Sequence, residues 1–351
     1  MRFCMKRIAT LAFGMCALTA AFGTQAMAGP VLDEIKASGN IICLVNTNSP
    51  GFSAPDSKGV FQGFNTDFGR MAAAAIFGDT SKADIRGIGF SDSMKTIVAR
   101  KAHMASRSIT STGTRDADPG LAFPVTTFYD GQGFMVANKL GVKSANELNG
   151  AVVCAEEGST TLLNIADWFG NRKMDYKVEN IGDKTARLQA FYAGKCDVLA
   201  SDYTALLSDR QLAPTPTDYT ILPEIISNEP LTLACQPDQE LEAILFWGFQ
   251  VMLTAEQYGV TSQNIDAIVK DIDKQPKAVK RLFGEKGATS EMAEKLQIPS
   301  NWAYNIIKQV GNYGEVYERH LGDSTVFKLD RKGTPNDLSS RGGLMYAYPI
   351  R

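Results

Sequence analysis

Two series of short apolar runs, separated by amphipathic segments, divide the chain into similar halves. In the first series, apolar runs bounded by Gly and Pro predict buried strands, and residues with helical spacing predict the helices between them. The predicted strands cover 40–46, 83–89 and 104–108, and the predicted helices cover 31–38, 65–77 and 91–101. This alternation is typical of a doubly wound α/β unit.

The second series repeats the same order further along the chain. Predicted strands cover 151–155, 176–180 and 194–202, and predicted helices cover 142–149, 162–169, 185–193 and 203–212. An extended run at 231–235 and a long helix at 239–259 follow, and the remainder is mostly helical with a loop-like tail at 342–351. The repeated order predicts an α/β protein with two lobes.

The first 28 residues have the features of a secretory signal peptide. Arg2, Lys6 and Arg7 give a basic start, and the apolar run at 8–22 is too short for a membrane span. Small residues at the end of this segment predict cleavage after Ala28. We therefore expect a secreted, periplasmic product that is not inserted in the membrane.

Charge and cysteine content exclude several classes of function. The formal net charge is −2 and no basic run is present, so we expect no nucleic-acid partner. No CxxC occurs and the chain has two histidines, so we expect no metal ion and no cofactor. Four cysteines follow the signal peptide, and in an oxidising compartment they allow three pairings: Cys43, Cys154, Cys196 and Cys235.

Candidate ligand-binding residues follow the strands of the first half. A hydroxyl-rich segment that includes Thr110 leads to Arg115, whose planar fork suits a carboxylate. A polar surface loop is the alternative for this segment. Phe52 follows a Pro-Gly turn after the first strand, where it forms either an aromatic wall of a binding site or an exposed loop residue.

The second half offers a complementary pair of features. Ser159 and Thr160 precede a predicted helix, so the free amides of its first turn form either an anion site or an ordinary N-cap. Asp202 ends a predicted strand, where it suits an ammonium group or caps the next helix. A cleft between the halves would therefore fit an α-amino acid, with its carboxylate at Arg115 and its ammonium at Asp202.

The chain resembles the periplasmic amino-acid-binding proteins of ABC transporters, in their general L-amino-acid-binding branch. The segments that carry the resemblance span nearly the whole chain after the signal peptide: NTNSPGFS at 46–53, AAAIFGD at 73–79, FYDGQGFMV at 128–136, GKCDVLASD at 194–202, LPEIISNEPL at 222–231, NWAYNIIKQVGNYGEVYERHLG at 301–322 and GGLMYAYPIR at 342–351. The resemblance implies a type II periplasmic binding protein fold, whose two lobes are joined by two hinge strands and close on the ligand. It also implies a monomer without catalytic residues, which delivers L-amino acids to an inner-membrane permease with its ATPase.

The resemblance divides the chain into four parts. We expect a signal peptide at 1–28, a first lobe at 29–132 plus 236–300, and a second lobe at 133–235 with hinge strands at both ends. The segment 301–351 is expected to form a C-terminal extension packed on the first lobe, because its helical part has an apolar face and its tail is aromatic.

Site residues also carry over from the family. Arg115 would bind the ligand carboxylate together with Thr110 and the helix that starts near Ser159 and Thr160. Asp202 would bind the ammonium, and Phe52 would pack on the ligand side chain.

Three departures from the family pattern concern the ligand side chain. Ser111 stands where this branch has tryptophan, and Ser93 stands where it has an arginine that could reach an acidic side chain. Glu156 replaces a glutamine and would favour a basic or amide side chain if it faced the cleft. We therefore expect a polar amino acid or a broad range, with acidic ligands disfavoured.

Two further expectations concern the cysteines and the alternatives to transport. We expect a Cys154–Cys196 disulfide, because both residues lie on strands expected to be neighbours in the second lobe. A ligand-sensing module for a membrane receptor would use the same binding site. A periplasmic dehydratase-like enzyme on this fold would need a general acid or base in the cleft, for which Glu156 is the candidate.

Overall fold

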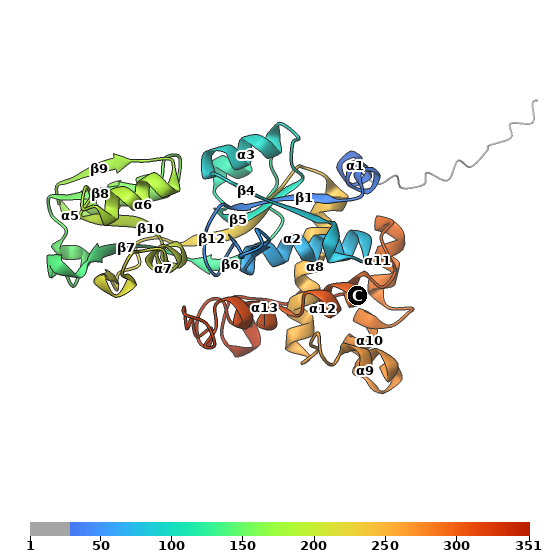
Figure 1. The fold of residues 1–351 in the computed structure, drawn as a ribbon. Helices are drawn as coiled ribbons and strands as arrows, with labels where there is room; N and C mark the ends of the chain where they lie inside the picture. The colour runs from blue at the N-terminus through green and yellow to red at the C-terminus, as the bar shows by residue number, and fades with distance from the viewer. Residues whose placement is uncertain (1–28) are drawn as a thin grey trace, which may run out of the picture.

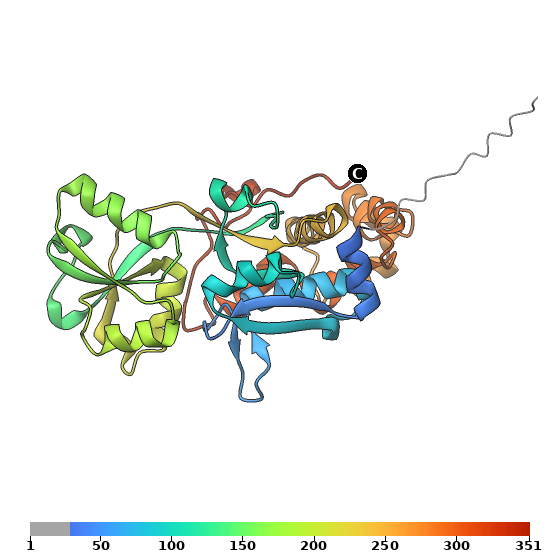
Figure 2. The same cartoon turned by 90° about the horizontal axis from the view of Figure 1, so that it is seen from above.

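A computed structural model describes residues 29–351. The signal peptide predicted at 1–28 lies outside the described residues. Two α/β lobes lie side by side and are joined by extended segments, with the second lobe in green in Figures 1 and 2. This is the two-lobed α/β fold that the sequence predicts.

A five-stranded mixed sheet forms the centre of the first lobe, in the order β4-β1-β5-β12-β6. β1 is parallel to β4 and β5, whereas β12 is antiparallel to β5 and β6. The strands are β1 (Ile41–Asn46), β4 (Ala83–Ile88), β5 (Met104–Thr110), β6 (Thr126–Asp130) and β12 (Glu229–Cys235). A separate hairpin pairs β2 (Ala54–Pro55) with β3 (Phe61–Gln62).

The helices of the first lobe pack closely on this sheet. The alanine-rich α2 is buried along most of its length, and Gly69 lets it approach β1, since a Cβ there would lie 2.9 Å from the Cys43 sulfur. Small side chains thus determine the close helix–sheet packing that supports the site. These helices are α1 (Pro30–Ser38), α2 (Phe64–Phe77), α3 (Phe90–Val98) and α4 (Gly113–Asp116).

The second lobe contains a sheet in the order β11-β7-β10-β8-β9. Its parallel centre, β10-β8-β9, continues into the antiparallel strands β7 and β11. The elements are β7 (Gln132–Ala137), β8 (Ala151–Ala155), α5 (Thr161–Arg172), β9 (Tyr176–Asn180), α6 (Lys184–Tyr192), β10 (Val198–Asp202), α7 (Tyr203–Gln211) and β11 (Tyr219–Ile221). Cys154 and Cys196 form the predicted disulfide, with 5.7 Å between their Cα atoms, and Cys43 and Cys235 are free and buried.

The chain crosses between the lobes at Gly131 and again just before β12. Asp130 ends β6 and Glu229 begins β12, and these two residues are cross-strand partners. β12 pairs along its length within the first sheet, so residues 231–235, which we expected at the edge of the second lobe, are part of the first sheet.

Helices after β12 complete the first lobe. They are α8 (Gln239–Gln257), α9 (Ile265–Lys270), α10 (Lys277–Phe283), α11 (Ala288–Leu296), α12 (Trp302–Gln309) and α13 (Tyr313–His320). α8 and α12 lie against α2 (Figure 1), and Trp302 and Tyr313 are fully buried in the same core. No helix within residues 29–351 combines the length and the apolar character needed to cross a membrane.

The tail after α13 runs back along the first lobe (Figure 2). Asn336 pairs with the backbone of Tyr129 on the edge strand β6, accepting from its N–H at 2.7 Å and donating to its carbonyl at 2.9 Å. Further on, the Tyr348 N–H donates to Gln250 of α8 at 2.9 Å. The tail thus covers a sheet edge immediately next to the first crossover.

One predicted helix is wrong. Residues 142–149 form only a 3₁₀ turn at Ala145–Glu147. The Ser144 hydroxyl and the Ala145 N–H both donate to the carboxylate of Glu224, which lies in a distant loop. This long-range contact satisfies the backbone without a helix.

Candidate functional site

A small cavity of about 60 Å³ lies between the two lobes. Both lobes contribute polar side chains to its lining, at the ends of strands and the starts of helices, as is usual for ligand sites in α/β proteins. The lining residues are Asn46, Phe90, Arg107, Ser108, Thr110 and Arg115 from the first lobe, and Glu156, Ser159, Thr160, Thr161, Ser201, Asp202 and Ala205 from the second.

Arg115 is the predicted carboxylate-binding residue, and it faces this cavity. It lies on the short helix α4, and its Nη1 donates to the Thr110 carbonyl at 2.8 Å. Its guanidinium carbon also lies 5.1 Å from the centroid of the Phe90 ring. Burial lowers the pKa of Arg115, while the carboxylates of Glu229 and Asp202 raise it, so Arg115 remains a cation between two acids.

A second arginine, Arg107, faces the same cavity, and sequence reasoning missed it. β5 and β12 lose their register between Thr232 and Leu233, and Arg107 and Ser108 fall in this gap without cross-strand partners. Ser108 has φ +56°, a conformation that few non-glycine residues adopt. The irregularity breaks the alternation of the strand, so Arg107 and Ser108 both line the cavity.

In the second lobe, Ser159 and Thr160 lie at the start of α5, as predicted. Their side chains do not cap this helix: the Ser159 hydroxyl donates to the Glu156 carbonyl at 2.6 Å, and Thr160 forms no capping bond. The expectation that a Ser or Thr side chain caps α5 is therefore wrong. The first turn of α5 keeps its amides without a side-chain cap beside the cavity.

A buried carboxylate, Glu229, lies behind these groups and was not predicted. It is 3 % exposed and accepts hydrogen bonds from both lobes. Thr110 and Thr160 donate to its Oε2 at 2.6 and 3.1 Å, and Asn164 and Ser227 donate to its Oε1 at 2.7 Å each. The hydroxyls predicted to hold a ligand carboxylate thus already hold a carboxylate of the protein, leaving Arg115 and the backbone amides of α5 for a ligand.

Asp202 faces the cavity from the end of β10 and does not cap α7. Burial raises the pKa of Asp202 well above its usual range, the carboxylates of Asp130, Glu229 and Glu156 raise it further, and Arg115 opposes them. A carboxyl group in this environment is stabilised when a cation arrives. Asp202 is therefore a buried carboxyl group at the cavity that a cation would stabilise in its ionised form.

Glu156 lines the cavity but already has a cationic partner from its own lobe. The Arg187 guanidinium lies 3.4 Å from its carboxylate. Ser93, the other position used to argue ligand preference, is fully buried, and its hydroxyl donates to the Phe90 carbonyl of its own helix at 2.8 Å. Neither side chain provides a free charge for a ligand.

Phe52 does not lie among the lining residues. It is 2 % exposed and packs edge-to-face against Phe64 and Phe128 in the core of the first lobe. The aromatic ring in the cavity is Phe90, at the first position of α3.

The lobes also touch outside the cavity. Lys184 of the second lobe forms an ion pair with Asp209 at 2.7 Å and donates to the Ser49 hydroxyl of the first lobe at 2.9 Å. These contacts and the interlobe bonds of Glu229 hold the two lobes together around the cavity.

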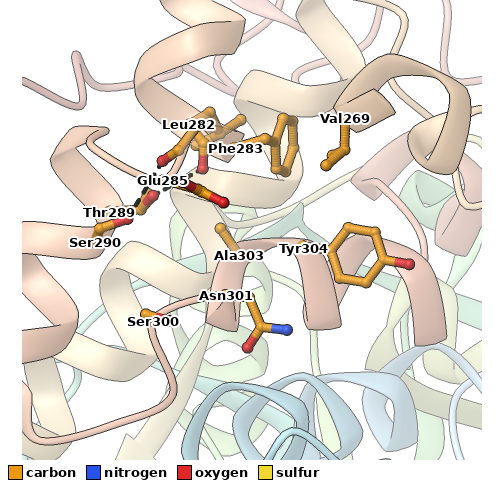
Figure 3. A pocket seen from close by; sticks show the side chains of 11 residues that line it. Val269, Leu282, Phe283, Glu285, Thr289, Ser290, Ser300, Asn301, Ala303 and Tyr304 are labelled. Carbon is orange, nitrogen blue, oxygen red and sulfur yellow. Dashed lines mark hydrogen bonds between the residues drawn. The ribbon is translucent and has the colours of Figure 1, made fainter. Parts of the chain in front are cut away.

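A larger cavity of about 500 Å³ lies elsewhere, among α9 to α12 of the first lobe (Figure 3). Its walls are mostly apolar, and Glu285 is the charged side chain that lines it. It lacks the paired cation and anion found between the lobes. Within residues 29–351, no group of three or more His, Cys, Asp or Glu side chains is arranged to hold a metal ion.

The chain is similar to known binding proteins of ABC transporters. The chain is 37 % identical over 350 residues to the general L-amino acid-binding periplasmic protein AapJ of Rhizobium johnstonii, covering 99 % of both chains. It is 38 % identical over 340 residues to the glutamate/glutamine/aspartate/asparagine-binding protein BztA of Rhodobacter capsulatus, covering 97 % of this chain and 98 % of that protein. No family model matches the chain.

Among solved structures, a periplasmic binding protein of an ABC transporter from Brucella ovis, with glutathione bound, superimposes with a TM-score of 0.85. The two chains are 35 % identical, and the match covers 91 % of this chain and 99 % of that one. Relatives of this identity and coverage establish the family. The chain belongs to the amino-acid-binding proteins of ABC transporters, and it has their two-lobed fold.

Proposed function

We propose that this protein captures free L-amino acids in the periplasm and delivers them to an ABC permease of the inner membrane. The observation that carries the proposal is that Arg115 from one lobe and Asp202 from the other line the same cavity. An α-amino acid has a carboxylate and an ammonium on one carbon atom, so it matches both groups at once. The names of the relatives, which include binding of general L-amino acids, support the same ligand class.

Closure of the lobes follows from the same contacts. A ligand held by Arg115 alone or by Asp202 alone would bind one lobe, whereas a ligand held by both favours the closed state. The permease can then distinguish loaded from empty protein by the relative position of the lobes. The chain contributes a binding site and a moving surface to transport, and we assign no catalytic group and no cofactor to it. We propose that it acts as a monomer.

A thermal-shift screen of the mature protein against the twenty L-amino acids tests this proposal. The protein is first unfolded and refolded to remove bound ligand, because a ligand that binds only the folded state raises the melting temperature. We expect shifts with several L-amino acids and none with their D-enantiomers. The absence of a shift with every L-amino acid would refute the proposal.

Two variants test the site assignment. Arg115→Lys keeps the charge but loses the bidentate fork, and Asp202→Ala removes the anion, so each should abolish most of the shift. Ser81→Ala, at a surface turn of the first lobe, serves as a matched control and should keep the full shift. Undiminished shifts in both site variants would place the ligand elsewhere.

A further inference from the structure

Arg107 is the most unusual charged group near the cavity. Its side chain lines the cavity, yet the residue is only 6 % exposed. Its Nη2 makes one long contact of 3.5 Å to the Ile88 carbonyl, and its Nε and Nη1 have no hydrogen-bond partner in the structure. Burying a guanidinium whose N–H donors have no partner costs free energy, unless an anion accepts hydrogen bonds from it.

The neighbours of Arg107 do not supply that anion. Burial lowers the pKa of Arg107 and the charge of Glu156 raises it, but Glu156 forms its ion pair with Arg187. Arg115 also belongs to the first lobe, and the two guanidinium carbons lie 4.9 and 5.1 Å from the centroid of one ring, that of Phe90. Two like charges on one aromatic ring repel each other, and anions between them would relieve this repulsion.

We propose that Arg107 forms a second carboxylate subsite, so that the preferred ligands are L-amino acids with an acidic side chain. This inference rests on the proposed function and specifies its ligand class. Arg115 takes the α-carboxylate, as in the proposed function, and Arg107 remains for the carboxylate of the side chain, while Asp202 takes the ammonium. The two carboxyl carbons of glutamate are about 5 Å apart. The guanidinium carbons of Arg107 and Arg115 lie 4.9 and 5.1 Å from the Phe90 centroid, which limits the distance between them.

The proposal reverses the preference argued from the sequence. That argument used Ser93 and Glu156, and the structure shows that neither side chain is free to meet a ligand. The arginine missing at Ser93 has a counterpart in Arg107, which approaches the cavity from β5 because of the irregular register there.

Calorimetric titration of the refolded protein with L-glutamate and L-glutamine tests this subsite. The two ligands have nearly the same shape, and only glutamate has a second carboxylate. We expect the wild-type protein to bind glutamate at least tenfold more tightly than glutamine. Arg107→Met should weaken glutamate binding at least 30-fold and change glutamine binding less than threefold.

A merely structural role of Arg107 predicts a different set of results. If Arg107 supports the fold or shares a single carboxylate with Arg115, its variant weakens both ligands alike, and the inference is refuted. Equal binding of glutamate and glutamine by the wild type refutes it as well, while leaving the proposed function intact. Binding of neither ligand nor any other L-amino acid refutes both.

Two further measurements separate the alternatives. Because Arg107 has free donors in the structure, Arg107→Met should leave the melting temperature of the ligand-free protein unchanged or higher, and a lower one would indicate a structural role. Glu156→Gln should keep the preference for glutamate. If Glu156 were the true partner of Arg107 across the cleft, this substitution would instead weaken both ligands equally, which contradicts the inference.

Discussion

The carboxylate of Glu229 accepts hydrogen bonds from both lobes. Replacing Glu229 should therefore weaken ligand binding, although Glu229 itself does not contact the ligand. Two of its four hydrogen bonds come from the second lobe, from Thr160 and Asn164. A hydrogen bond to a charged group contributes about 1.5 kcal/mol or more. Glu229→Ala removes both bonds and should therefore destabilise the closed state by about 3 kcal/mol, which raises the Kd roughly 100-fold.

An isosteric control sharpens this prediction. In Glu229→Gln the amide oxygen can still accept from Asn164, and the new NH₂ group would face the hydroxyls of Thr110 and Thr160, which can rotate to accept. The interlobe contacts survive and only the charge is lost, so the Kd should rise less than tenfold. The order wild type, Gln, Ala is therefore the expected order of decreasing affinity.

Isothermal titration calorimetry gives the Kd values, and small-angle X-ray scattering at saturating ligand reports closure. Circular dichroism confirms that both variants are folded. An affinity of Glu229→Ala within threefold of the wild type would refute the reasoning. It would mean that the carboxylate does not contribute to closure, although it contacts both lobes.

Three further predictions concern protons and the disulfide. Because burial and neighbouring acids raise the pKa of Asp202, an arriving ammonium should favour its ionised form. Calorimetry in buffers of different ionisation enthalpy should therefore show proton release on binding that Asp202→Asn lacks, and equal heats in all buffers would contradict this. Burial raises the pKa of Asp130 from 3.8 to about 6, so the folded state binds more protons in this range and stability falls as pH rises through it. Asp130→Asn should remove about 2 kcal/mol of this loss between pH 4.5 and 7 in urea titrations, and an unchanged pH dependence of stability would argue against it. Replacing Cys154 and Cys196 by Ser removes a cross-link between positions 42 residues apart and should lower the free energy of unfolding by about 4 kcal/mol. A decrease of less than about 1 kcal/mol would show that the disulfide contributes little to stability.

The strands and helices that pack into the two cores were predictable because their apolar periodicity is strong. The strand predicted at 176–180 matches β9, and the helix predicted at 239–259 matches α8 to within two residues. The disulfide was predictable for a related reason, since it joins Cys154 of β8 to Cys196, two residues before β10, and these strands are neighbours. The prediction of a helix at 142–149 failed because Glu224 binds this segment, and a contact between residues so far apart leaves no pattern in the local sequence.

Some residues of the candidate site were also predictable from the sequence, and others were not. Arg115 and Asp202 were predictable because ligand-binding residues follow strand ends in α/β sheets. Arg107 was not, because regular alternation along β5 would not place it beside Ser108 on the cavity side, and only the register shift opposite Thr232 does so. Glu229 reads in the sequence as an ordinary polar residue before a proline, and its role depends on two lobes meeting around it.

A crystal structure of the refolded protein with its tightest-binding L-amino acid tests the central claim most directly. The account predicts one ligand molecule in the interlobe cavity, with its α-ammonium within hydrogen-bond distance of Asp202 and its α-carboxylate bonded to an arginine of the first lobe at that cavity. A ligand bound in the cavity among α9 to α12, or an ammonium directed away from Asp202, would contradict it.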